Sequence, residues 1–506
     1  MFNKYSTEKK WSYALSCMLV IYLATACNKL LSVPPPTSQI SSQLVFNTDK
    51  SAESALVGVY TNLISGSGQD GAMQLFAAGL CSFTGGLSSD ELTITLPNSI
   101  LTASLYGYNS NHIITDNAGT TGSMQASSDY IWKSAYSAIY GANAVITGVA
   151  ASTSGALHDS VRHVLTAEAK GIRAFCYFYL VNFFGDIPLL TNSEPITQIT
   201  ASRTPTAQVY NQIISDLTDA QAALPSDYAA GNGNRIRFNK WVATALLARV
   251  YLYTKQYDEA AKQATNVIDN TSLFGIENNL NNVFLTSSRE AIWQLQQNVK
   301  DNNTGNAVPE SSIFLPVPLN TGLTLQSLSP QLLQAFEPED MRRKNWVDST
   351  SIDLTALGGS AGTFYLPFKY KTGRYNAVVG GTPTEFYMVL RLAEQYLIRA
   401  EAEANTNNPQ AAVADINVLR QRAGLASLST SLNQGDVLTA IAHERQTEFF
   451  CEWGHRWFDL KRTAQAHNVL SQITLKQPWA GDYQLLYPLP YSDLLRDSKL
   501  VQNPGY

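Results

Sequence analysis

The sequence has little of the residues that most often carry metal, redox or acid–base chemistry. Its 506 residues include five cysteines and six histidines, and only 15% of them are charged. There is no C-x-x-C pair and no H-E-x-x-H, so no zinc or dithiol redox motif is indicated. The formal net charge of −5 gives no electrostatic reason to expect a nucleic acid partner. A chain that is polar without being charged, with 25 tyrosines, suits neutral and hydroxyl-rich ligands.

Motifs for nucleotide binding and for a catalytic nucleophile are also absent, or their flanking sequence does not suit that function. The sequence contains no P-loop and no G-x-S-x-G. GSGQDG (Gly66 to Gly71) formally fits G-x-G-x-x-G, but the segment before it has helical and not strand periodicity. A dinucleotide site needs a strand there, so we interpret this stretch as a plain loop and expect no cofactor.

The first 26 residues have the order of a secretory signal. Three lysines (Lys4, Lys9 and Lys10) precede an apolar run from Trp11 to Ala26, which is too short to span a membrane comfortably. The run ends LATAC, which resembles a bacterial lipobox although Leu23 lies one place early. We therefore predict a lipoprotein signal peptide over 1–26 and lipid attachment at Cys27. The alternative is an ordinary cleaved signal peptide.

The next segment, 27–44, is predicted to be a tether. Pro34, Pro35 and Pro36 favour a stiff, extended chain, which suits a protein held at a membrane surface.

From residue 45 onward the sequence predicts one mainly α domain, 45–506, with an N-terminal half to about 235 and a C-terminal half from 236. Helical periodicity covers Asp49 to Ile64, Ser128 to Val149, Ser160 to Phe184, Pro205 to Leu224 and, as two helices, Asn239 to Asn270. Ala248, Tyr251 and Ala260 occupy tetratricopeptide-like packing positions, and Ala400 and Ala412 repeat the twelve-residue offset. The fold class is thus a tetratricopeptide-like helical hairpin scaffold with long irregular insertions.

Two insertions interrupt this scaffold, Ser65 to Ser127 and Leu280 to Gly381. Both are rich in Gly, Ser, Asn and Thr, with aromatic residues among them. Long irregular segments on a rigid scaffold often carry binding sites, so we expect the ligand to lie there.

The stretch ERQTEFFCEWGHRWFDLKR, Glu444 to Arg462, holds the densest group of ionisable residues. If one helix continues through Gly454, its apolar face is Phe449, Trp453, Trp457 and Leu460, and its opposite face is Glu444, Glu448, Glu452, His455 and Asp459. A glycosidase carboxylate pair usually comes from separate elements facing a cleft. We therefore interpret the stripe, flanked by Arg445 and Arg456, as a structural ion-pair lattice; an exported hydrolase is the alternative.

Four stretches together resemble the SusD/RagB family of surface nutrient-binding lipoproteins. They are Val45 to Leu63, Ala167 to Leu190 with its Gly-Asp-x-Pro-Leu ending, Leu390 to Gly424, and Glu444 to Arg462 with the terminal Tyr487 to Tyr506. The resemblance implies a non-enzymatic, lipid-anchored outer-membrane protein that captures glycans and passes them to a SusC-like TonB-dependent transporter. Some relatives take peptides or another nutrient instead, and that alternative stays open. Residues after Cys27 lack the acidic signature of many surface-exposed members, so exposure at the cell surface is implied by the family alone.

The resemblance also implies a shallow, aromatic-lined glycan site, because a flat ring packs against the C–H face of a sugar. Its position suggests residues of the two insertions as glycan-binding candidates: Tyr106, Tyr108, Asn109, Phe314 and Trp346. Each of them has an alternative interpretation as a residue that packs its own loop.

Overall fold

The computed structural model of the chain describes residues 45–65, 75–97, 103–113, 127–194, 201–316 and 324–506. The signal segment 1–26, Cys27 and the tether 27–44 lie outside the described residues. Within those ranges no helix is both long and apolar enough to cross a membrane. The α-helices are α3 (Asp49–Ile64), α4 (Leu80–Ser88), α5 (Ala103–Ser110), α6 (Ser127–Ala151), α7 (Asp159–Phe184), α9 (Thr206–Ala223), α10 (Lys240–Tyr253), α11 (Tyr257–Ile268), α12 (Pro309–Phe314), α13 (Pro330–Ala335), α14 (Met341–Asn345), α15 (Leu392–Asn405), α16 (Pro409–Arg422), α17 (Gln434–Glu448), α18 (His455–Arg462), α19 (Ala466–Leu470) and α20 (Tyr491–Arg496).

The strands are short and pair only in twos among the described residues. They are β1 (Leu92–Ile94), β2 (Ile187–Pro188), β3 (Arg203–Thr204), β4 (Ala291–Leu295), β5 (Gln326–Leu328), β6 (Val347–Asp353), β7 (Ala361–Pro367) and β8 (Tyr387–Arg391). The pairs β1–β5, β2–β3, β4–β8 and β6–β7 are all antiparallel. The fold is therefore mainly α, as the sequence predicts.

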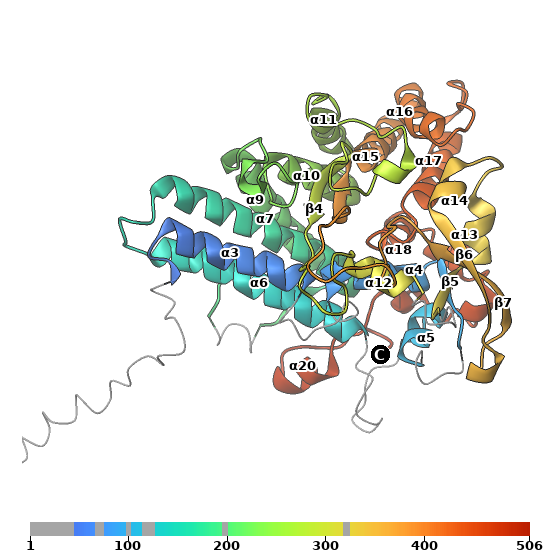
Figure 1. Cartoon of the computed structure of the whole chain (residues 1–506), viewed down its shortest axis with the longest axis horizontal. Coiled ribbons are helices and arrows are strands. Elements are labelled where there is room, and N and C mark those ends of the chain that lie inside the picture. Colours follow the sequence, from blue (N-terminus) through green and yellow to red (C-terminus); the bar gives the residue numbers. More distant parts are fainter. Residues whose placement is uncertain (1–44, 66–74, 98–102, 114–126, 195–200, 317–323) are drawn as a thin grey trace, which may run out of the picture.

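Three long helices, α3, α6 and α7, form one end of the molecule, and the β6–β7 hairpin lies at the opposite end (Figure 1). Helix α6 buries the apolar side that its periodicity predicts, including Ile131, Ala135 and Ile139. Helix α7 ends at Gly185, whose φ of 75° is a left-handed conformation that glycine adopts without strain. The chain then enters β2 with Ile187.

Two helical hairpins, α10–α11 and α15–α16, confirm the predicted scaffold. Although about 120 residues separate them in sequence, α11 packs directly against α15. Small buried side chains allow this close approach: Ala248 and Ala260 on the first hairpin, and Ala402 on the second, are fully buried in one cluster.

The expectation of one continuous helix over Glu444 to Arg462 is wrong. Helix α17 ends at Glu448, and α18 begins only at His455. Cys451, Trp453 and Gly454 all have positive φ, and a Cβ on Gly85 of α4 would lie 2.6 Å from the Gly454 Cα. The turn therefore exists because α4 and α18 approach each other at two glycines, a long-range contact that local periodicity does not reveal.

One aromatic core runs through both halves of the chain. The Phe175 ring of α7 lies 4.8 Å from the Trp293 ring of β4 and 5.5 Å from the Trp453 ring, between centroids. Trp453 in turn stacks on Tyr387 of β8 at 4.7 Å, and both are at most 2% exposed. Because such rings bury large apolar areas, this core holds the N-terminal helices and the later hairpins together.

Candidate ligand-binding cleft

Four of the five residues proposed from the sequence are buried, which corrects the expectation that they face a ligand. In the first insertion, Tyr108 is 0% exposed and its hydroxyl accepts a hydrogen bond from the Ser128 backbone N–H. Burial raises the pKa of Tyr108, so the hydroxyl stays neutral. Asn109 uses its amide to fix β1, accepting from the Ile94 N–H at 3.0 Å and donating to the Leu92 carbonyl at 3.1 Å. These two residues build the insertion and do not line its surface.

The second-insertion candidates are interior residues as well. The Phe314 ring is 3% exposed and packs edge-on against Phe83. Trp346 is 0% exposed, its indole N–H donates to the Leu280 carbonyl at 3.0 Å, and the Lys369 ammonium lies 4.9 Å from its ring centroid. Only Tyr106, on α5, remains at the surface, with 36% of its area exposed.

The two insertions nevertheless meet in the structure. Strand β1 belongs to the first insertion and β5 to the second, and they pair with Thr93 opposite Ser327. The Ser327 hydroxyl accepts from the Tyr365 N–H at 2.9 Å, which joins β5 to the β6–β7 hairpin. Gly359 in the hairpin turn comes so close that a Cβ there would lie 2.8 Å from the Thr95 carbonyl oxygen.

A cleft of about 520 Å³ opens at this junction, and we refer to it as the insertion cleft. Its described lining is Thr93, Ile94, Thr95, Pro97, Ser327, Leu328, Pro330, Leu333, Gly358, Gly359, Ser360, Thr363, Phe364 and Tyr365. None of these lining residues is an Asp, Glu, Lys, Arg or His. The lining therefore combines hydroxyl groups, apolar side chains and two aromatic rings, which is the composition that a neutral polyhydroxylated ligand needs.

Helix α14 contacts one of the aromatic residues that line the insertion cleft. Phe364 and Tyr365 are both half-buried, and the Arg343 guanidinium lies 4.8 Å from the centroid of the Tyr365 ring. One ring face is thus supported by a cation. The preceding residue, Arg342, points the other way, into the protein interior, where it is 0% exposed.

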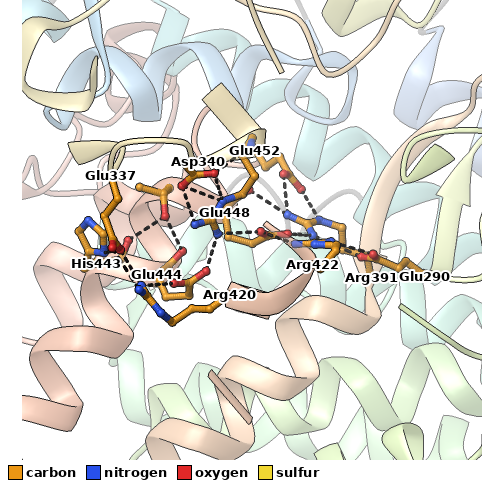
Figure 2. Close-up of polar contacts among 12 residues, drawn as sticks. Glu290, Glu337, Asp340, Arg391, Arg420, Arg422, His443, Glu444, Glu448 and Glu452 are labelled. Carbon is orange, nitrogen blue, oxygen red and sulfur yellow. Dashed lines mark hydrogen bonds and ion pairs between the residues drawn. The ribbon is translucent and has the colours of Figure 1, made fainter. Parts of the chain in front are cut away.

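Arg342 enters a buried cluster of carboxylates that includes Asp340, Glu444 and Glu448, which Figure 2 labels. Arg342 donates to Glu448 at 3.1 Å and to Asp340 at 2.8 Å, and it also pairs with Glu444. Arg391 of β8 binds both oxygens of Glu452 at 2.9 Å. We refer to these residues, with Arg422, Glu290 and Lys369, as the buried ion-pair network.

The electrostatics of the network fit a structural role. Burial opposes ionisation of Glu448, but Arg422, Arg391 and Arg342 hold its pKa well below the usual range. Glu452 is likewise buried, and Arg391 and Lys369 lower its pKa. Both carboxylates are therefore ionised and fully paired, and neither has the raised pKa and open access that a general acid would need. This supports the interpretation of the stripe as an ion-pair lattice. Arg445 pairs with Asp459 of the stripe as expected, whereas Arg456 pairs with Asp90. The partners of Glu448 and Glu452 come from other elements.

The sequence-based selection did not include the cleft residues Phe364 and Tyr365, because position within the insertions was its only guide. Two stretches that contain β-branched, hydroxyl-bearing and aromatic residues, Val347 to Asp353 and Ala361 to Pro367, flank a segment with Gly358 and Gly359. This pattern is a signal for a hairpin and could have directed attention there. No local signal marks Thr93 or Ser327, since the β1–β5 pair is formed by segments more than 230 residues apart.

Comparisons with known proteins agree with this architecture. A family model described as "SusD family" matches residues 341–506, and one described as "Starch-binding associating with outer membrane" matches residues 88–252. "SusD-like protein P2" of Formosa agariphila is 30% identical over 74% of this chain and 80% of its own length. "Starch-binding protein SusD" of Bacteroides thetaiotaomicron is 23% identical over 67% of this chain and 72% of its length.

Solved structures give the same result. A "Laminarin binding SusD-like protein" superposes with a TM-score of 0.71 and 26% identity, covering 91% of this chain and 100% of that chain. "Surface glycan-binding protein A from Bacteroides thetaiotaomicron" has a TM-score of 0.71 at 20% identity, which shows the shared fold. On its sequence identity to these relatives and on its architecture, the chain belongs to the SusD family.

Proposed function

We propose that this protein binds neutral glycans in the insertion cleft and delivers them to a TonB-dependent outer-membrane transporter. The observation that carries the proposal is the lining of the cleft, which offers hydroxyls and two aromatic rings and no charged side chain. A pyranose ring would pack its C–H face on Tyr365, and its hydroxyls would exchange hydrogen bonds with Thr93 or Thr363.

The paired state of the network carboxylates supports a binding role over a hydrolytic one. Glu444, Glu448 and Glu452 are each at most 5% exposed and bound to arginine or lysine. A glycosidase needs two carboxyl groups that reach the scissile bond, and these do not open onto the insertion cleft.

The binding proposal is tested with neutral polysaccharides. Laminarin is the first probe because a similar protein is described as laminarin-binding. We expect retention of the protein in affinity electrophoresis and binding of laminari-oligosaccharides in calorimetry. Tyr365→Ala removes the stacking surface and should cost about 1–3 kcal/mol of binding free energy, by analogy with stacking of bases on aromatic side chains.

Tyr140→Ala is the matched control, since Tyr140 is 48% exposed on α6 and does not line the insertion cleft. Its affinity should equal that of the unmodified protein. Equal losses in both variants, or binding of peptides in place of glycans, would contradict the proposal.

The anchoring part of the proposal rests on the sequence before residue 45. Lipid on Cys27 would hold the protein at the outer membrane beside its transporter. Cys27→Ala should then shift the protein from the outer-membrane fraction to the soluble periplasmic fraction when the transporter is deleted. A variant that still sediments with the membrane in that strain would show that the lipid is elsewhere or absent.

A further inference from the structure

A second cleft, of about 830 Å³, lies where the end of α7, strand β3, helix α18 and the C-terminal tail meet. It shares no lining residue with the insertion cleft. Its lining holds four cationic side chains, Arg203, Lys461, Arg462 and Lys499, against one carboxylate, Asp186. The cleft therefore has an excess of positive charge, although the formal net charge of the whole chain is −5. We refer to this cavity as the lysine cleft.

Two of the four cations already have partners. Arg462 binds Glu401, with 2.7 Å between Nη2 and Oε2, and donates to Asp459 at 2.8 Å. Arg203 donates to the carbonyls of Asp186 and Val501, at 2.7 and 2.9 Å, and also to Asn503. The Asp186 carboxylate itself accepts from the backbone and hydroxyl of Thr206. These contacts fix the walls of the cleft.

Lys461 lacks such compensation. Its ammonium donates to the Asn182 carbonyl and lies 5.4 Å from the Trp457 ring centroid, and no ion pair joins it to a carboxylate of the described chain. An ammonium group has three donors, so two are left for another acceptor. Burial of the ammonium group lowers the pKa of Lys461 to about 7, which is the consequence of a cation without a counter-charge.

Aromatic side chains stand beside this lysine. Tyr210 and Tyr253 both line the lysine cleft, and the Tyr210 hydroxyl is fixed by hydrogen bonds with Asn182 at 2.9 and 3.2 Å. The cavity volume lies within the range of about 300–1,000 Å³ that small-molecule sites occupy. A flat ring, a free ammonium and room for more than one sugar unit therefore occur together.

We propose that the lysine cleft binds a sugar acid, with the carboxylate on Lys461 and the pyranose ring against a tyrosine. Lys461 would then supply the charge recognition that the insertion cleft lacks. This site does not depend on the neutral-glycan site, because the two clefts are built from different residues. A negative result for one cleft would therefore not contradict the proposal for the other.

The test compares cellobiouronic acid with cellobiose, which differ only by one carboxylate, in calorimetric titrations of the full chain. We expect the acid to bind and the neutral disaccharide to bind at least about tenfold more weakly, as loss of a charge-assisted hydrogen bond implies. Lys461→Met should lose about the same factor. Because methionine keeps the apolar stem and removes a buried charge, this variant should fold normally.

Lys300→Met, which removes an exposed lysine elsewhere, is the control and should bind the acid with unchanged affinity. Tyr365→Ala should also bind it unchanged, which separates this site from the insertion cleft. The proposal is overturned if cellobiouronic acid does not bind, if cellobiose binds equally, or if Lys461→Met keeps full affinity. Displacement of the acid by an equal concentration of sulfate would likewise overturn it, since the site would then bind any anion.

Discussion

Arg342 and Arg343 are neighbours on α14, and they serve two regions of opposite chemistry. Arg342 points inward to Asp340, Glu444 and Glu448 and has no exposed surface. Arg343 points outward and lies behind the Tyr365 ring at the insertion cleft. The buried ion-pair network is dense in charge and closed to solvent, whereas the cleft is open and free of charged side chains.

The difference shows how a chain with few charged residues uses them. The network joins α14, β8, α16 and α17, so it fixes the second insertion to the helical scaffold. In the proposed binding mode, charged residues in this part of the molecule stabilise the fold, and aromatic rings and hydroxyl groups contact the ligand.

The largest effect is expected from breaking the network. Glu448→Ala leaves Arg342, Arg391 and Arg422 buried without a shared carboxylate. We expect a loss of about 3–5 kcal/mol in the free energy of unfolding, because uncompensated buried charges are costly. Chemical denaturation measures it, with Glu259→Ala, which breaks an exposed pair with Lys262, as a control that should change little. Equal stability of both variants would remove the structural role of the network.

Trp346→Ala should behave like a core mutation. The indole fills the space beside Lys369 and is fully buried, so its truncation should destabilise the fold by about 3–5 kcal/mol. Thermal or chemical unfolding will show this. If the variant keeps its stability and loses only glycan affinity, Trp346 belongs to the ligand site after all and the boundary between the two regions is misplaced.

The buried acid Glu310 should make stability depend on pH. It is 3% exposed, accepts hydrogen bonds from Ser82 and Tyr387, and has a pKa raised by burial to about 8. In the unfolded chain the Glu310 carboxyl group ionises near pH 4.5, whereas in the folded protein this group stays protonated up to about pH 8. Its stabilising contribution is therefore complete below pH 4.5 and is lost as pH rises through 8.

Glu310→Gln removes this titration and isolates its contribution. Relative to the unmodified protein, the variant should gain on the order of 3 kcal/mol between pH 5 and pH 8. Denaturation at the two pH values gives the difference directly, and other titrating groups cancel in the comparison. A constant difference between the proteins would mean that Glu310 is ionised in the folded state.

The smallest effect concerns salt. No ion pair is available in the insertion cleft, so binding of a neutral oligosaccharide should change less than about twofold between low and high ionic strength. Calorimetry with the same oligosaccharide at two salt concentrations measures this. A steep decrease would place a charged residue, such as Arg343, in contact with the ligand.

The sequence predicts the scaffold well because its information is local. Small residues at Ala248 and Ala260 mark the helix crossing of one hairpin, and the structure places them in a single cluster with Ala402 of the other. The sequence does not predict the break between α17 and α18, because the apolar spacing of Phe449, Trp453 and Trp457 also fits a continuous helix. The contact between Gly85 of α4 and Gly454 before α18 favours the break, and these two glycines are far apart in sequence.

For the same reason, the sequence indicates the region of the proposed site but not the individual residues that line it. Composition directs attention to the two insertions, and their β1–β5 pairing lies at the proposed cleft. Size is a poor guide within them, because a long irregular segment buries its largest rings, such as Trp346, to hold itself together. The half-buried Tyr365 is left at the surface by the register of the β6–β7 hairpin, which pairs it with Ser349.

The central claim is that glycan is recognised in the uncharged insertion cleft and not by the charged groups behind it. A crystal structure of the protein with a laminari-oligosaccharide tests this most directly. We predict a sugar ring stacked on Tyr365, with its hydroxyls bonded to Thr93 or Thr363 and no contact to the network carboxylates. Density for the sugar at any other surface, with the insertion cleft empty, would contradict the account.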